Sequence, residues 1–395
     1  MARLLKKLGH ALSRKQTGIR HIPSGAVSSI PGFADGIESY IKNTSEMVRN
    51  IRTSLNSETD ETVIEGNSPF FLTGSPASEN PHTKVVLLIH GLTDSPFVTR
   101  DLANTFNQQG FDVLSILLPG HGTCPGDLLE VNWRDWVKAQ ADALDALVER
   151  YSDVYLCGFS LGAVLNLYQA ATDKRIKGLF LFSPALQLPP AVLITCGLSG
   201  MSQWLPHLKW IDIQPDDDLF KYESTAANAI CQTSQLVNCV KELLVLSMPE
   251  IPVFMAASED DATVQISAVM PFFDQLKADH KRLLFYSTRR QQLSAKVRMI
   301  FSELPDKKII SSSHMAMIVA PDNPHYGQQG SYAYCNHYYQ SDPEKYKRCK
   351  AFKEDALGEV LSETNPQQVV RRLTYNPWYD ELEQELNKFI EKLVN

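Results

Sequence analysis

Short apolar runs alternate with amphipathic stretches from about residue 84 onward. Runs that are apolar throughout indicate strands buried on both faces, as in a parallel sheet covered by helices. The expected strands are 85–89, 111–118, 154–157, 178–182, 253–257, 282–286 and 308–310. The expected helices are 37–51, 99–109, 133–151, 163–172, 266–279 and 378–394. The pattern therefore predicts an α/β fold with a mostly parallel central sheet flanked by helices.

Three segments depart from this alternation and define the expected domain organisation. Residues 1–60 are predicted to form an N-terminal helical extension, and residues 61–395 the main domain. The segment 187–250 falls between two strands, which favours a lid over the carboxyl edge of the sheet. A peripheral helical elaboration is the alternative. The segment 321–365, rich in Tyr, Gly and Asn, follows the last expected strand and is predicted to lie near the same edge.

The first twenty residues are basic and contain no acid. Leucines at helical spacing within them predict a short amphipathic helix, which is either a frayed terminal helix or a peripheral membrane anchor. Its apolar stretch is short and interrupted by Lys6 and Lys7, which is not typical of a secretory signal. No apolar run reaches the length of about 18 residues that a membrane-spanning helix needs.

Composition places the chain among globular proteins. Of 395 residues, 44% are hydrophobic and 21% charged, and the net charge of −7 gives no overall basic footprint for nucleic acid. The seven cysteines are odd in number and scattered, which favours a reducing, cytoplasmic location over a disulfide framework. Only Cys335 and Cys349 are considered as a pair. With His337 they make an incomplete zinc pattern, so no metal site is predicted.

The pentapeptide at 158–162, Gly-Phe-Ser-Leu-Gly, carries the clearest chemical signal. An apolar strand precedes it and a helical run follows it. In this setting G-x-S-x-G is typical of a nucleophile elbow, a tight turn that exposes one serine hydroxyl. Glycines let the strand and helix backbones approach closely around that residue. Ser160 is therefore the candidate nucleophile.

A serine nucleophile needs a base and an acid that orients the base. In this fold class they follow the serine in the order acid, then histidine. Asp261 follows the strand at 253–257 and is the preferred acid, with Asp260 and Glu259 as alternatives. His314 follows the expected last strand and is the preferred base.

Two other histidines, His325 and His337, lie farther into the insertion and fit the base position less well. Acyl transfer also needs two backbone N–H donors for the carbonyl oxygen. Leu161, after the nucleophile, and Leu92, in the loop after the first long strand, are the candidates for this oxyanion hole.

Four motifs together resemble the serine α/β-hydrolases, most closely the carboxylesterase and monoacylglycerol-lipase branch. They are the apolar strand ending in His-Gly-Leu-Thr-Asp-Ser-Pro at 90–96, Leu-Pro-Gly-His-Gly-Thr at 118–123, the pentapeptide at 158–162 and Ser-His-Met at 313–315. The resemblance covers roughly residues 60–320 and the final helix. It implies an α/β-hydrolase fold with a small lid, and cofactor-free ester hydrolysis.

We therefore expect a serine hydrolase that cleaves carboxylic esters through an acyl-enzyme on Ser160. Its expected partner is a small-molecule ester or lipid, and no nucleic acid. Apolar residues of the predicted lid suggest an apolar acyl group: Leu186, Leu188, Val192, Leu193, Trp204, Leu205 and Trp210. A thioesterase or acyltransferase using the same three residues is one alternative, and a non-catalytic membrane-docking scaffold is another.

Overall fold

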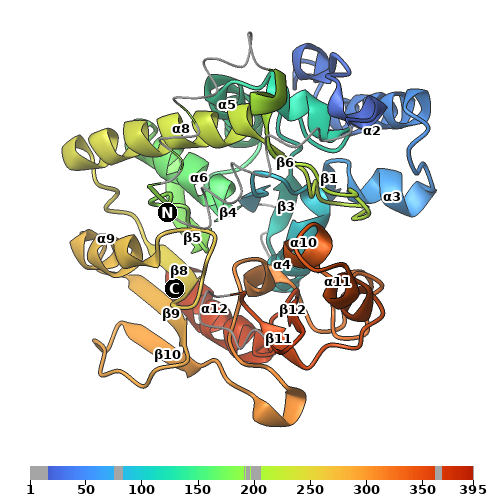
Figure 1. Ribbon diagram of the computed structural model, residues 1–395. Coiled ribbons are helices and arrows are strands. Elements are labelled where there is room, and N and C mark those ends of the chain that lie inside the picture. Colours follow the sequence, from blue (N-terminus) through green and yellow to red (C-terminus); the bar gives the residue numbers. More distant parts are fainter. Residues whose placement is uncertain are drawn as a thin grey trace.

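The computed structural model describes residues 17–74, 83–190, 192, 196, 206–360 and 367–394. Its main feature is an eight-stranded sheet in the order β1-β3-β2-β4-β5-β8-β9-β10, shown in Figure 1. Strand β1 pairs antiparallel with β3, and the other neighbouring strands pair in parallel. The strands are β1 Phe70–Leu72, β2 Lys84–Ile89, β3 Asp112–Ser115, β4 Asp153–Phe159, β5 Ile176–Phe182, β8 Val253–Ser258, β9 Lys281–Ser287 and β10 Val297–Phe301.

Helices cover both faces of this sheet. Because successive residues of a strand point to opposite faces, Leu87 and Leu156 enter one core while Val86 and Tyr155 enter the other. The first core is completed by helices α2, α5, α6, α8 and α9, and the second by α4 and α12. The helices are α2 Ile37–Ser54, α4 Arg100–Gln108, α5 Trp133–Val148, α6 Leu161–Thr172, α8 Ala227–Leu246, α9 Val269–Gln275 and α12 Tyr379–Val394.

The predicted fold class is confirmed, and one predicted strand is wrong. Residues 308–310 form no strand of the sheet; Ile309 makes only isolated bridges to Leu304 and Leu357. The last strand is instead β10, which was not predicted. It lies at the sheet edge with Arg298 and Phe301 exposed, so it lacks the continuous apolar run that marks the inner strands.

Other predicted boundaries shift by a few residues. Strand β3 ends at Ser115, earlier than the predicted 118. The expected helix at 266–279 begins as a 3₁₀ turn, Ile266–Ala268, and its α-helical part ends at Gln275.

The described part of the N-terminal extension is docked on the main domain. Helix α2 buries Tyr40 and Val48, and the Tyr40 hydroxyl accepts a hydrogen bond of 3.1 Å from the backbone N–H of Leu117. A short helix, α3 Glu61–Gly66, follows. The predicted basic helix falls within residues 1–16, outside the described residues, and the division at residue 60 stays a prediction.

The segment predicted as a lid is described only in part. Strands β6 Trp210–Asp212 and β7 Thr225–Ala226 form a small antiparallel ribbon, and the long helix α8 follows, packed beside α6 (Figure 1). Leu186 and Trp210 are buried in the first core. Leu193, Trp204 and Leu205 lie outside the described residues, so the lid interpretation stays a prediction.

The insertion after residue 320 contains two short helices, α10 Asn336–Tyr339 and α11 Pro343–Lys350, which lie next to each other in Figure 1. It contacts the segment between β6 and β7 through buried polar groups. His325 Nε2 lies 3.0 Å from Asp218 Oδ1, the Tyr326 hydroxyl donates to the same carboxylate, and the Tyr332 hydroxyl donates to Glu223.

A second small sheet forms where the chain passes from the insertion back to the main domain. In it, β11 Ala356–Gly358 pairs with β12 Val370–Arg372.

Four of the seven cysteines are paired. A disulfide joins Cys335 to Cys349 within the insertion, with an S–S distance of 2.07 Å, and it removes these two cysteines from any zinc site. His337 instead approaches the carbonyl oxygen of Val370 at 3.0 Å. A second disulfide joins Cys196 to Cys231 of α8. The expectation of reduced, scattered cysteines did not anticipate this pair, because the two residues are 35 positions apart and share no local motif.

Candidate active site

Ser160 lies at a sharp turn between β4 and α6. Its φ of 53° and ψ of −108° place a non-glycine residue in a region of backbone strain. The turn is possible because small residues flank it. A Cβ added at Gly162 would lie 2.2 Å from the carbonyl oxygen of Ile89, and one added at Gly158 would lie 2.4 Å from the backbone of Gly162. The strand–turn–helix geometry is that of a nucleophile elbow.

Ser160, His314 and Asp261 form one hydrogen-bonded chain. His314 Nε2 lies 2.9 Å from Ser160 Oγ, and His314 Nδ1 lies 2.5 Å from Asp261 Oδ2. All three residues are buried. Ser160 follows β4, Asp261 lies in the turn after β8, and His314 lies in the loop after β10. Because the carboxyl ends of these parallel strands lie at the same edge of the sheet, the topology brings together residues up to 154 positions apart.

The acid turn after β8 separates Asp261 from the two alternative carboxylates. Asp261 Oδ1 accepts hydrogen bonds from the backbone N–H groups of Thr263 and Val264, at 2.7 and 3.2 Å, which leaves Oδ2 for His314. Asp260 instead accepts a hydrogen bond from the Thr288 hydroxyl, and Glu259 accepts one from the side-chain amide of Gln291. The structure thus brings Asp261, and neither neighbour, to His314.

Electrostatics favour the ionised form of Asp261. Burial alone would raise its pKa, but the adjacent His314 and the hydrogen bonds it receives hold the pKa below its ordinary value. The carboxylate is therefore charged at neutral pH. A charged carboxylate at Nδ1 keeps the proton on that nitrogen and leaves Nε2 free to accept the serine proton.

The two predicted oxyanion donors belong to two different segments, the start of α6 and the turn after β2. Leu161 is the first residue of α6, so its N–H has no acceptor within the helix. Leu92 lies in the turn after β2, where His121 Nε2 approaches its carbonyl oxygen at 2.6 Å. His121 thus ties the Leu-Pro-Gly-His-Gly-Thr turn to the loop that carries Leu92.

His90 anchors the same loop from inside the protein. The N–H of Leu118 donates to His90 Nε2 at 3.1 Å, so the ring proton resides on Nδ1, which donates to the carbonyl oxygen of Gly91. Burial lowers the pKa of His90 to about 3, so the ring is neutral. His90 therefore acts as a fixed two-ended link between β2 and the segment after β3.

Sequence reasoning missed a buried ion pair that also contacts this loop. Lys221, from the segment between β6 and β7, donates to Asp94 Oδ1 at 2.6 Å and to Thr93 Oγ1 at 2.7 Å. Burial would raise the pKa of Asp94, yet the Lys221 ammonium holds it below its ordinary value. No local motif links positions 94 and 221, so only the folded chain reveals the pair.

A second missed pair, Glu359 and Arg372, adjoins the predicted acid and base. The backbone N–H of His314 lies 3.3 Å from Glu359 Oε2, and Arg372 donates to the same oxygen at 2.8 Å. Arg372 also donates to the Thr263 hydroxyl, at 2.6 Å. The other alternative bases lie elsewhere: His325 contacts Asp218 and His337 contacts Val370, not Ser160.

A family model described as serine aminopeptidase, S33, matches residues 80–292, which is more than half of the 395 residues. The chain belongs to this family. The matched region includes Ser160 and Asp261 and ends before His314. Family membership and the central parallel sheet together identify a serine hydrolase with the α/β-hydrolase fold.

Two curated proteins are similar over about the same region. A thermostable monoacylglycerol lipase from Bacillus sp. (strain H-257) is 27% identical over 225 residues, which cover 56% of this chain and 85% of that enzyme. A carboxylesterase from Bacillus subtilis (strain 168) is 24% identical over 219 residues, which cover 54% of this chain and 87% of that enzyme.

Among solved structures, the monoacylglycerol lipase of Paleococcus ferrophilus is 19% identical with a TM-score of 0.45, covering 55% of this chain and 88% of that one.

No group of three or more His, Cys, Asp or Glu side chains in the described part of the chain is arranged to hold a metal ion. Among the same residues, no helix has both the length and the apolar character needed to cross a membrane.

Proposed function

We propose that this chain hydrolyses carboxylic esters through a covalent acyl-enzyme on Ser160. The observation that carries the proposal is the unbroken chain of contacts from Ser160 Oγ to His314 to Asp261 at the carboxyl edge of the sheet. Similarity to a monoacylglycerol lipase and a carboxylesterase supports an ester as the substrate class.

In the first half-reaction, Ser160 Oγ attacks the ester carbonyl carbon while His314 Nε2 takes the hydroxyl proton. The new imidazolium is stabilised by the carboxylate of Asp261, which stays ionised. Negative charge builds on the former carbonyl oxygen, and the backbone N–H groups of Leu92 and Leu161 are the proposed donors to it. The C–O bond to the alcohol then breaks, and the alcohol leaves with the proton from His314.

In the second half-reaction, a water molecule attacks the acyl-enzyme. His314 Nε2 accepts a proton from the water, the bond to Ser160 Oγ breaks, and the serine recovers that proton. One ester and one water thus give one alcohol and one acid. Apart from the ester and the water, these steps use only groups of this chain, and we propose no cofactor.

We propose an apolar acyl group on the substrate, as expected for a lipid or related ester. Apolar pockets discriminate weakly between similar chains, so several chain lengths should be accepted.

The experiment is a panel of p-nitrophenyl esters of rising acyl length, assayed with the full chain. Hydrolysis that rises with chain length supports an apolar acyl site, and hydrolysis of acetate alone contradicts it. No hydrolysis of any ester contradicts the proposed function itself. Matched thioesters and acceptor alcohols in the same assay separate hydrolysis of esters from the thioesterase and acyltransferase alternatives.

The proposed location and membrane contact need separate tests. The expected cytoplasmic location stays a prediction, and the two disulfides weigh against it because disulfides persist mainly in oxidising compartments. Thiol counting before and after reduction decides whether four cysteines are paired. Liposome co-sedimentation with and without residues 1–20 tests peripheral contact through the basic segment.

A further inference from the structure

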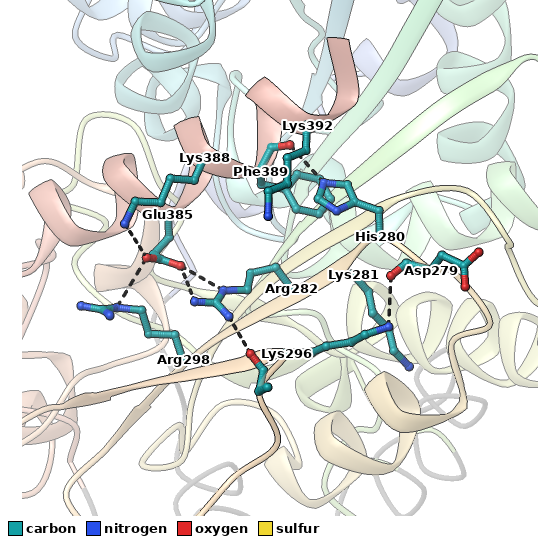
Figure 2. A pocket seen from close by; sticks show the side chains of 11 residues that line it. Asp279, His280, Lys281, Arg282, Lys296, Arg298, Glu385, Lys388, Phe389 and Lys392 are labelled. Carbon is teal, nitrogen blue, oxygen red and sulfur yellow. Dashed lines mark hydrogen bonds and ion pairs between the residues drawn. The ribbon is translucent and has the colours of Figure 1, made fainter. Parts of the chain in front are cut away.

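A cationic recess lies on the opposite side of the molecule from Ser160. It has a volume of about 550 Å³ and is lined by residues at the starts of β9 and β10 and on the last turns of α12 (Figure 2). In a parallel sheet the strand starts and strand ends lie on opposite edges, and Asp261 and Ser160 follow strand ends. The recess is therefore separate from the proposed catalytic site.

Positive charge dominates the lining of this recess. Six lysine and arginine residues line it beside only two acidic residues, whereas the whole chain has a net charge of −7. Two of the six ammonium groups are bonded to backbone carbonyl oxygens, that of Lys281 at the end of α9 and that of Lys296 at Asp279. The six are Lys281, Arg282, Lys296, Arg298, Lys388 and Lys392. A concave, low-dielectric wall concentrates such a field and attracts anions.

The buried carboxylate of Glu385 does not neutralise the positive charge of these side chains. Glu385 is buried and receives hydrogen bonds from Arg282 at 2.6 Å and Lys388 at 3.1 Å, while Arg298 Nε lies farther away, at 3.7 Å from its Oε1. Figure 2 shows the three cations grouped around this one carboxylate. Within the described residues, no group accepts a hydrogen bond from Lys392, which lines the recess one turn beyond Lys388. Donors of Arg298 and Lys392 thus remain available for a second anion.

We propose that this recess binds a phosphate-type anion, held by Arg298 and Lys392 with support from Lys388. A phosphate-type anion has several oxygens that share its negative charge. These oxygens can accept hydrogen bonds from the Arg298 guanidinium and from the ammonium groups of Lys388 and Lys392. The same chemistry is offered by a free polyphosphate and by the headgroup of an anionic lipid, and the experiment separates the two sources.

The test measures binding of pyrophosphate to the full chain by calorimetry, with sodium chloride of equal ionic strength as the salt control. We expect saturable binding that the double variant Arg298→Ala/Lys392→Ala weakens by about tenfold or more. The matched control Lys138→Ala/Lys347→Ala removes two cations that are over 70% exposed and paired on the surface, and should leave binding unchanged.

Vesicles of phosphatidylcholine with and without phosphatidic acid form the second arm. Binding only to phosphatidic acid vesicles, lost in the recess variant, assigns the site to a lipid headgroup. Absence of binding in both arms overturns the proposal, as does equal weakening in the control variant. Because none of the four substituted residues belongs to the proposed catalytic site, ester hydrolysis serves as the check that each protein is folded.

A different observation carries a second inference, which rests on the proposed function. Strands β11 and β12 pair so that Gly358 is opposite Arg372, which sets Glu359 beside Arg372. Glu359 is buried, and its Oε2 also lies 3.5 Å from the backbone N–H of Ala262 in the acid turn. One ion pair therefore contacts the acid turn through Ala262 and Thr263 and the base through the N–H of His314.

We infer that Glu359 and Arg372 are positioning residues. They hold the acid turn, which carries Asp261, at bonding distance from the histidine loop, residues 311–314. They also balance the charge around His314. Further contacts tie the same small sheet to the histidine loop. The Glu359 N–H donates to Ser311 Oγ at 2.9 Å, and Ser313 Oγ donates to the carbonyl oxygen of Leu373 at 2.5 Å.

The signature of this role is a pair of opposite shifts in the pH profile. Glu359→Gln leaves the Arg372 charge unbalanced, which disfavours the imidazolium and moves the acid limb of kcat/KM to lower pH. Arg372→Gln leaves the Glu359 charge unbalanced and moves that limb to higher pH. The double variant should return close to the original profile.

Arg371→Gln is the matched control. Arg371 is the neighbouring buried arginine on β12, but it pairs with Glu354 at 3.0 Å and should not move the acid limb. Shifts of the same sign in both single variants, or reduced activity without any shift, contradict the positioning role.

The pH dependence of the rate at which a fluorophosphonate labels Ser160 reports the same acid limb and requires no ester turnover. A wild-type chain that is labelled but cleaves no ester contradicts the proposed function while leaving the positioning test intact.

Discussion

At the scale of single residues, the sequence left three candidates for the carboxylate that faces the histidine. Three acids occupy positions 259–261, and their order along the chain does not say which one turns toward His314. The structure separates them by their partners, since only Asp261 bonds His314 while Asp260 bonds Thr288. The choice depends on backbone N–H groups of the turn, which sequence alone does not reveal.

Asp261→Asn should lower kcat by about three to four orders of magnitude, because an amide cannot hold the imidazole in the required tautomer. Asp260→Asn and Glu259→Gln are the controls and should change kcat less than about tenfold. The measurement is steady-state hydrolysis of a p-nitrophenyl ester, with circular dichroism to verify folding. A larger loss in either control than in Asp261→Asn contradicts the assignment.

At the scale of elements, the inner strands were predictable because burial on both faces leaves a continuous apolar run. The edge strand β10 and the pair β11 and β12 were not, since they are short or half exposed. The candidate nucleophile and base were predictable from motif and order. Glu359 and Arg372 were not, because their contacts with the site depend on the path of an insertion that has no recognisable pattern.

The elbow depends on close approach of β2, β4 and α6. Gly162→Ala should lower both stability and activity, since its Cβ would meet the Ile89 backbone, which cannot move without disturbing β2. We expect a loss of about 2 kcal/mol or more in the free energy of unfolding, as for other overpacked sites. Gly32→Ala is the control, because a Cβ there meets nothing within 4 Å.

Urea unfolding followed by tryptophan fluorescence measures both glycine variants. Equal stability of Gly162→Ala and the wild type would mean that strand and helix are not packed as closely as the structure has them.

At the scale of the whole molecule, distant segments are joined by buried aspartates. Asp94 pairs with Lys221, Asp216 with His21 of the N-terminal extension, and Asp261 with His314. Burial would raise the pKa of each, but its charged or hydrogen-bonding partners hold the pKa below the ordinary value.

These lowered pKa values predict loss of stability in acid. The unfolded chain binds protons at these positions near pH 4, before the folded chain does, so the free energy of unfolding falls as pH drops through the ordinary aspartate range. Lys221→Met should make this dependence shallower and also lower stability at neutral pH, because Asp94 loses its partner. Urea unfolding at about pH 7 and about pH 4.5 measures both effects.

Lys138→Met is the matched control for that experiment, since its partner Asp142 is on the surface and the pair contributes little. An unchanged pH dependence in Lys221→Met contradicts the role assigned to the buried pair.

The most direct test of the whole account is covalent labelling of the full chain with a fluorophosphonate, followed by mass spectrometry of the modified peptide. We expect one adduct, on Ser160, and no labelling of Ser160→Ala, whose ester hydrolysis should fall by at least about a thousandfold. Ser152→Ala, an exposed serine before β4, should label and turn over as the wild type does. Labelling at another serine, or full ester hydrolysis by Ser160→Ala, would contradict the central claim.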